Sequence, residues 1–567
     1  MNPPKITPES APMPDSPDCS FEALNTHCNE LIFARKNWDI LWDDAARYIM
    51  PRKGNILTKR TSGQEQTIQI YDTTADKANK VFAAGLVSNI VPAGEKWFRF
   101  EAKNPQASEG VRQWLAATSD IITDLIYTSN FYRGIHEDFL DAGCFNTSAM
   151  LMEEGKKYAF NFVNIPVGFF AIDEDSEGNV DTFCREWEWT ARQAAQKWGR
   201  DRLGKQCCDS LDAGSKQGGK KFKFRHLVKP RMDGVVDLGY AAPTARPWAS
   251  YYLCLEDKCV VEEGGYYEFP YLTSRLLRSN GEVYGRGPGL DAMPEIKMVN
   301  AMERDILAAV QKMVNPPWLS PDDSSYTPDN RPNGVTYWDS TQQQNKPEQL
   351  EMKNRVDLGE QKTEQKREII RDAFYNQMFQ MLTTMEEQKR EKTAYEVQQM
   401  VAEKLVLFSP LFARMCEEKL NPLLERAVGI AARRGLLPPP PSGAVEDGEY
   451  QIVYTSKIAL AIKAAENQSF ATMIQLVMQM AQLDSSVVDV VDWRGGFRKV
   501  ARNIAFPPSL IRDDAEVDRR QADKQKALQE QQQAEHAQAM TQSAKNLGPG
   551  AQKLATEKLQ AAAQTMS

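Results

Sequence analysis

The sequence predicts a mainly α-helical protein with a β-rich insertion, an α+β fold built from several segments. The first observation is a set of long amphipathic stretches at 284–318, 360–385 and 411–434, in which apolar residues recur every three or four positions. The second is a series of strand-like runs within 223–283, separated by turn residues. The third is the composition of the 567 residues, 42% hydrophobic and 26% charged, which is typical of a soluble protein with a core.

The chain is organised around the stretch 284–318, YGRGPGLDAMPEIKMVNAMERDILAAVQKMVNPPW. Its apolar side chains fall on one face of a helix of about 25 residues, roughly 38 Å long. That stripe consists of Leu290, Met293, Ile296, Val299, Met302, Ile306, Val310 and Met313. Asn315-Pro316-Pro317 must end the helix, because a proline ring clashes with the preceding turn.

Glycines precede this helix at positions 285, 287 and 289, which invites comparison with a loop that cradles phosphates. Such a loop needs a lysine and a hydroxyl at a set spacing, or a preceding strand within a βαβ unit, and neither is evident. Pro288 also removes one of the backbone donors. We therefore interpret the glycines as a turn that leads into a structural helix.

Three segments precede this helix. Residues 1–20 are rich in proline and serine and predict a flexible N-terminal tail. Residues 21–199 predict helices plus a small sheet, with helices at 21–50, 108–128 and from 133, and strands at 160–165, 169–172 and 180–189. Residues 200–283 predict a β-rich region.

Two charged stretches in this part have alternative interpretations. The acidic turn at 173–179 resembles the start of a calcium loop, but its twelfth position is Cys184 rather than a glutamate, so we favour a hairpin turn. The basic stretch at 216–231 has the charge to meet phosphates. A solvated edge or a subunit contact explains it equally well.

The remaining segments alternate between loops and helices. Residues 319–359 predict a loop region, and residues 360–435 predict long helices that end at Gly435. Residues 436–512 predict a strand at 451–454 and helices at 457–483 and 493–505. Residues 513–567 are rich in Gln and Ala and predict either a helix supported by neighbouring copies or a frayed tail.

The sequence predicts no catalytic, cofactor-binding or metal site. The nine cysteines include no CxxC pair, and the four histidines show no metal-ligand spacing, which indicates reduced thiols rather than zinc. No nucleophile elbow accompanies a Ser-His-Asp set. The net charge of −8 argues against a basic nucleic-acid binder. No apolar run approaches the roughly 20 residues that span a bilayer, and the N-terminus has no signal pattern.

Five blocks, in this order, resemble the head-to-tail connector, or portal, proteins of short-tailed bacteriophages. They are YDTTADKANKVFAAGLVSNIVPAGEKWFRF, FLDAGCFNTSAMLMEEG, GNVDTFCREWEWTARQAAQKWG, YGRGPGLDAMPEIKMVNAMERDILAAVQKMVNPP and KTAYEVQQMVAEKLVLFSPLFARMCEEKLNPLLERA. Each block is a weak signal by itself, but together they span about residues 25 to 510.

The resemblance implies a dodecameric ring at one capsid vertex, with a central channel for double-stranded DNA that is packaged and later ejected. It implies wing, stem, clip and crown regions: a wing at 21–199, a β-rich clip at 200–283, a stem helix at 284–318, wing and crown helices at 360–435 and a crown at 436–512. Implied partners are further copies of the chain, DNA without sequence specificity, the terminase, tail or adaptor proteins, and capsid and scaffolding proteins, with no membrane. The implied location is the virion, after assembly in the host cytoplasm.

Within this scheme two sets of residues are candidates for function. Lys346, Lys353 and Arg355 lie in a candidate tunnel loop and are expected to face DNA, with solvated loop charge as the alternative. Met298, Met302, Ile306 and Met313 are expected at a subunit interface, with packing inside one subunit as the alternative. Two other classes remain open, a different structural ring protein such as a tail adaptor and an enzyme with an unrecognised site.

Overall fold

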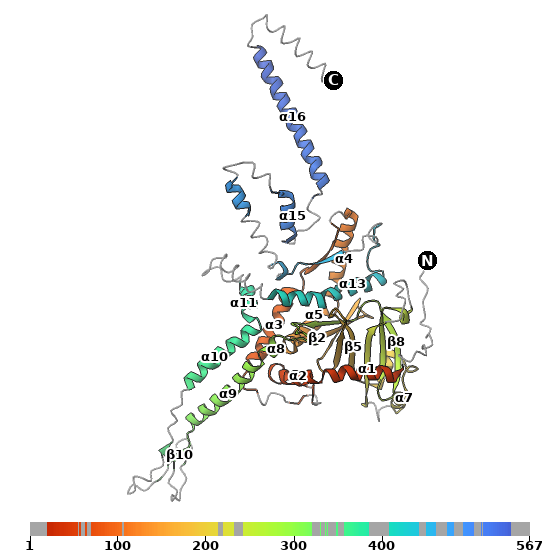
Figure 1. Ribbon diagram of the computed structural model, residues 1–567, viewed down its shortest axis with the longest axis vertical. Coiled ribbons are helices and arrows are strands. Elements are labelled where there is room, and N and C mark those ends of the chain that lie inside the picture. The colour runs from red at the N-terminus through yellow and green to blue at the C-terminus, as the bar shows by residue number, and fades with distance from the viewer. Residues whose placement is uncertain are drawn as a thin grey trace. The chain divides into compact units, whose positions relative to one another are not determined.

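The structure is a computed structural model, and it confirms a mixture of helices and sheets in an α+β fold (Figure 1). It describes residues 20–54, 56–57, 63–64, 70–104, 107–213, 219–231, 242–319, 329, 335, 337, 348–349, 356–384, 408–441, 450–456, 458–460, 473–480, 491–503, 512 and 514–545. The chain forms two compact units, Met1–Glu466 and Asn467–Ser567. No helix in these ranges is long and apolar enough to cross a membrane.

The first unit begins with two helices, α1 (Phe21–Ala34) and α2 (Lys36–Ile49), where the sequence predicts one. The break is at Arg35, whose buried side chain donates to the carbonyl of Phe170 and pairs with Asp39 at 2.8 Å. A contact with a distant strand therefore interrupts a pattern that is helical throughout.

A helical layer follows. It contains the short 3₁₀ turn η2 (Pro51–Lys53), α3 (Thr74–Ile90), α4 (Glu109–Thr128) and α5 (Phe131–Phe145). The largest hydrophobic core lies here and includes Trp42, Phe82, Trp97 and Phe139, all buried. The Trp42 indole N–H donates to the Phe145 carbonyl at 3.1 Å, which attaches α2 to the end of α5.

Asn146 turns the chain from α5 into a sheet. Its left-handed conformation (φ 60°) is tolerated by asparagine better than by most residues. The strands β2 (Thr147–Glu154), β3 (Phe160–Ile165) and β9 (Tyr271–Arg275) form an antiparallel sheet in the order β3-β2-β9. β9, the last strand of the predicted β-rich region, therefore belongs to this three-stranded sheet, in which it pairs with β2 directly after α5.

A second sheet has five antiparallel strands in the order β4-β5-β6-β7-β8. They are β4 (Phe170–Glu174), β5 (Val180–Thr190), β6 (Lys221–Pro230), β7 (Trp248–Cys254) and β8 (Cys259–Tyr266). The 3₁₀ turn η4 (Pro243–Ala245) precedes β7. β5 pairs with β6 from Phe183↔Val228 to Thr190↔Lys221, so the boundary that the sequence suggests at residue 200 falls inside one sheet.

Two short helices, α6 (Ala191–Trp198) and α7 (Lys205–Asp212), connect β5 to β6. The Thr190 side chain caps α6, and Gln193 completes a capping box. Both helices cover one end of the five-stranded sheet through a small separate core that includes Trp187, Trp198, Cys207, Phe224 and Cys254.

The organising stretch forms α8 (Pro288–Asp291) and α9 (Met293–Val314), and the prolines after Asn315 end it as predicted. α9 lies beside α10 (Val356–Ala373), and the two form a helical hairpin (Figure 1). Beyond these helices, β10 (Trp318–Leu319) pairs antiparallel with β11 (Glu348–Gln349).

The rest of the first unit closes the core. Its elements are α11 (Asn376–Thr384), the π-helical turn η6 (Cys416–Leu420), α13 (Asn421–Arg433) and β12 (Tyr450–Tyr454). β12 pairs with β1 (Phe98–Ala102). Gly435 follows α13 with φ 65°, as its predicted role in ending the helix requires.

The second unit includes α15 (Trp493–Asn503) and α16 (Asp514–Lys545). Residues 514–545 of the Gln/Ala-rich segment therefore form a helix of 32 residues. Within the predicted long helices at 360–435, residues 385–407 lie outside the described residues, as does nearly all of the predicted N-terminal tail.

Candidate functional site: the helical hairpin and its base

The glycines before α9 are required by close packing. A Cβ at Gly285 would lie 2.2 Å from the Asn146 carbonyl oxygen, and one at Gly289 would lie 2.2 Å from that of Cys144. The N–H of Gly285 also donates to the Thr147 hydroxyl at 2.9 Å. These backbone groups face the α5–β2 junction, which agrees with the structural interpretation of the motif.

Aromatic rings fix the same segment to α2. The ring of Tyr284 lies 5.0 Å from that of Trp42, edge to face, and 5.6 Å from that of Trp38. The N–H of Ile172 donates to the Tyr284 hydroxyl at 3.2 Å. The guanidinium of Arg286 lies 4.8 Å from the centre of the Trp38 ring. The start of the hairpin is therefore held by elements far from it in sequence.

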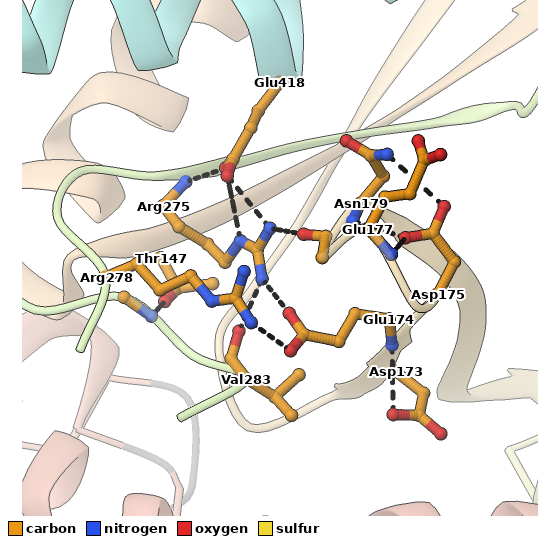
Figure 2. Close-up of polar contacts among 12 residues, drawn as sticks. Thr147, Asp173, Glu174, Asp175, Glu177, Asn179, Arg275, Arg278, Val283 and Glu418 are labelled. Carbon is orange, nitrogen blue, oxygen red and sulfur yellow. Dashed lines mark hydrogen bonds and ion pairs between the residues drawn. The ribbon is translucent and has the colours of Figure 1, made fainter. Parts of the chain in front are cut away.

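A buried cluster of ion pairs, called the ionic centre below, forms around Arg275, which precedes this segment in the chain (Figure 2). Arg275, only 1% exposed, pairs with Glu174 at 2.8 Å and with Glu418 at 2.9 Å. It also donates to the carbonyls of Gly178 at 2.7 Å and Val283 at 3.0 Å. Because these partners come from the β4–β5 turn, η6 and the lead-in to α8, one guanidinium joins three distant segments.

A second buried ion pair lies between Lys419 of η6 and Asp138 of α5, with the Ser148 hydroxyl within 2.9 Å of the ammonium. Burial lowers the pKa of the Lys419 ammonium, and the charge of Asp138 opposes this shift. Nearby, burial raises the pKa of Asp141 to about 6, although Lys53, 2.5 Å away, acts in the opposite direction. We call this region, where α5 and η6 meet, the base of the hairpin. In it, the charges of buried groups affect the pKa values of their neighbours.

Polar contacts attach the first turns of α9 to the body and to α10. Arg367 of α10 pairs with Asp72 and with Glu303 of α9, each at 2.7 Å. The Asn300 side-chain oxygen accepts from the N–H of Tyr71 at 2.8 Å. Ile306 lies against Gly359 of α10, because a Cβ at residue 359 would be 3.3 Å from its Cδ1. Ile306 therefore has a partner within its own subunit.

The second half of α9 has no buried residue. Met298 and Met313 are 46% and 45% exposed and Val314 is 80% exposed, whereas Met302 is half-buried. The predicted apolar stripe therefore divides into a part that contacts α10, around Ile306, and a part that faces solvent in a single chain.

The hairpin helices are nearly neutral overall. Acidic residues are Glu295, Glu303, Asp305, Asp357, Glu360, Glu364, Glu368 and Asp372, and basic residues are Lys297, Arg304, Lys312, Lys362, Lys366, Arg367 and Arg371. The proposed DNA-facing residues Lys346, Lys353 and Arg355 lie outside the described residues, in the segment that connects the two helices.

The sequence did not indicate the ionic centre. Arg275, Glu174 and Glu418 are separated by about a hundred residues or more, and each belongs to a stretch with other charges. One local signal of a buried charge exists at Lys419, which falls on the same helix face as the apolar residues Met415 and Leu423. That signal is weak, because lysine side chains usually reach solvent.

Comparison with known proteins identifies the family to which a chain with this hairpin belongs. A family model described as bacteriophage head to tail connecting protein matches residues 22–511. The chain belongs to this family. The match includes the three-stranded and five-stranded sheets, the ionic centre and the two helices of the hairpin.

Two relatives are similar along nearly their whole length. The portal protein of Salmonella phage epsilon15 is 26% identical over 536 residues, which cover 93% of this chain and 95% of the relative. The probable portal protein of Bordetella phage BPP-1 is 25% identical over 518 residues, which cover 89% and 92%. The resemblance inferred from the five sequence blocks is therefore confirmed, and this head-to-tail connecting protein is compared with whole portal proteins rather than with one shared domain.

Proposed function

We propose that this chain forms a dodecameric ring at one capsid vertex, through which double-stranded DNA is packaged and later ejected. Membership of the connecting-protein family supports a portal role over that of a tail adaptor, since both relatives are named as portals. The structural observation that carries the proposal is the half-exposed apolar face of α9.

A ring explains why that face is apolar. Met298, Met313 and Val314 are open to water in one chain, yet full burial of such a side chain contributes about 1.5 to 3 kcal/mol. In a closed ring each copy offers two different surfaces to its neighbours, and we propose that the exposed apolar part of α9 meets the next copy. The hairpin is then the stem that surrounds the channel.

The charge balance of the hairpin suits a conduit. Each lysine or arginine that contacts a phosphate strengthens the attachment of DNA. Helices with nearly equal numbers of acidic and basic residues hold the duplex weakly and allow it to slide. Lys346, Lys353 and Arg355 supply local positive charge in the connecting segment, and we propose that they touch DNA.

The end of the hairpin is the better candidate for docking terminase and tail proteins. The resemblance implies a β-rich clip at 200–283, the region that meets these partners in the family, but β6 and β7 lie inside the five-stranded sheet and β9 pairs with β2. Leu319 of β10, by contrast, is more than half exposed beyond the ends of both helices. We propose that the segment between α9 and α10 meets these partners.

A native mass measurement with electron-microscopy class averages tests the ring. We expect twelve copies around an open centre. A stable monomer, or a filled particle, contradicts the proposal. A ring that binds a tail protein but never a terminase supports the tail-adaptor alternative.

The DNA contacts need a functional assay in phage-infected cells. Alanine at Lys346, Lys353 and Arg355 together should leave the ring mass unchanged and lower the yield of DNA-filled particles several-fold. A control variant with alanine at the exposed Lys36, Lys156 and Lys205 should package normally. Equal yields from both variants contradict a DNA-facing role for the first set.

A further inference from the structure

Three thiols and a carboxylate meet where α7 packs on the β7–β8 hairpin, in a region that the proposed function does not use. Cys207 lies on α7, Cys254 ends β7, Asp257 lies in the turn, and Cys259 begins β8. The Sγ atoms of Cys207 and Cys254 are 3.9 Å apart, and Cys254 Sγ is 3.8 Å from an Asp257 carboxylate oxygen. The Sγ atoms of Cys207 and Cys254 and a carboxylate oxygen of Asp257 all lie within 4.8 Å of one another.

These spacings match the edges of a tetrahedral metal site. With zinc–sulfur bonds of about 2.3 Å, two thiolates on one zinc ion are about 3.8 Å apart, and a thiolate and a carboxylate oxygen about 3.6 Å. Cys259 faces Cys254 directly across the antiparallel pair, and opposed side chains there lie on the same face. Cys259 is not one of the three residues whose ligand atoms already lie together, and we infer that its side chain turns to bring a third sulfur toward them.

The carboxylate is held in place for this role. Asp257 accepts the N–H of Gln206 at 2.8 Å on one oxygen and that of Cys207 at 3.2 Å on the other. Each oxygen has a second lone pair, so these bonds orient the group without using its capacity to bind a cation.

We propose that Cys207, Cys254 and Asp257, with Cys259 as the fourth ligand, bind one thiophilic divalent cation of the zinc class. The site is structural, because four protein ligands leave no open position. It stabilises the small core beneath α6 and α7, which is separate from the main core of the subunit. A closed metal site can supply folding energy that so small an apolar cluster lacks.

The sequence concealed this site because its ligands come together by strand pairing and helix packing. Cys254 and Cys259 are five positions apart, and Cys207 precedes them by almost fifty residues. No CxxC pair results, although the hairpin turn brings the first two opposite each other.

The test is metal analysis of the tag-free, full-length protein made in zinc-supplemented medium and freed of loose metal by a weak chelator. We expect about one zinc per chain, falling at least five-fold in Cys207→Ser and Cys254→Ser. Cys208→Ser is the matched control, since the Cys208 thiol points instead to the carbonyls of Arg200 and Leu203. Cobalt in place of zinc should give the thiolate charge-transfer absorption of a tetrahedral site.

Several outcomes overturn the proposal. They are zinc-free protein without a cobalt spectrum, equal zinc in Cys207→Ser and wild type, or zinc lost equally in the Cys208→Ser control. Thiol titration of the denatured, unreduced protein adds an independent readout. A loss of two thiols that is abolished by Cys254→Ser indicates a disulfide in place of a metal site. None of these outcomes depends on ring formation, so the metal site and the portal proposal fail separately.

Discussion

Arg275 shows how much of the subunit depends on one buried side chain. Its guanidinium pairs with Glu174 and Glu418 and donates to two carbonyls, so every donor direction of the planar fork is occupied. A lysine in its place offers a point charge and cannot reach all of these acceptors. The carboxylates would then be left partly unpaired in a buried environment.

We therefore expect Arg275→Lys to lower the free energy of unfolding by about 3 to 5 kcal/mol, measured by urea titration of the full chain. Arg278→Lys is the control. Arg278 contacts the same Glu174 but is partly exposed, so its loss should cost about 1 kcal/mol or less. Similar losses in the two variants contradict a special role for Arg275.

Asp141 makes the base of the hairpin sensitive to pH. Burial raises its pKa from 3.8 to about 6, so the native state holds this proton more tightly than the unfolded chain. Its stabilising contribution is therefore complete below pH 3.8 and is lost as the pH rises through 6. Above that value the buried carboxylate is charged, and Lys53 is the cation that pairs with it, 2.5 Å away.

Asp141→Asn should thus gain stability relative to wild type as the pH rises from about 4 to 7, by about 2 kcal/mol. Urea titrations at several pH values measure the difference. Lys53 keeps a second partner in Glu137, 3.5 Å away. Glu22→Gln, at an exposed carboxylate on α1, should show no such trend, and a flat difference for Asp141→Asn contradicts the assignment.

At the scale of the element, the glycine-rich lead-in determines how α9 leaves the body. A methyl group at Gly289 would overlap the Cys144 carbonyl oxygen, and backbone cannot move aside as a flexible side chain does. We expect Gly289→Ala to lower the free energy of unfolding by about 3 kcal/mol or more. Limited trypsin digestion should also cut sooner after Lys297.

Gly264→Ala is the control for this change, because a Cβ at Gly264 meets no atom within 4 Å. It should leave both stability and digestion near wild type. Wild-type behaviour of Gly289→Ala contradicts the packing role of the motif.

Sequence patterns predicted where the helices lie in the chain better than where they break and what they pack against. The apolar period and the terminal prolines located α9, and the alternation of residues located most strands. The breaks at Arg35 and at Tyr375 between α10 and α11 were not predicted, because tertiary contacts and a left-handed backbone (φ 57°) override a continuous helical pattern. Likewise, a local pattern predicts that Ile306 and Met313 share a stripe but not that Ile306 lies against Gly359 of α10 while Met313 is 45% exposed.

At the scale of the whole molecule, the exposed apolar part of α9 is the surface that we propose holds neighbouring copies together in a ring. Met313→Glu places a charge on the face proposed to meet the next copy, and burial of an unpaired charge is strongly unfavourable. We expect this variant to remain folded but monomeric, as measured by native mass and circular dichroism. Gln311→Glu adds the same charge at an exposed position two residues away and should still form rings. Rings of unchanged mass from Met313→Glu contradict an interface at this face.

The pairing of β1 with β12 has a consequence for synthesis on the ribosome. Phe98 and Tyr454 are partners in one ladder, so the strand made early has no neighbour until almost the whole matched region has been translated. The buried rings of Trp97 and Phe98 depend on that late strand for part of their cover. A chain broken off before residue 450 therefore keeps an open sheet edge at β1 and cannot complete this core.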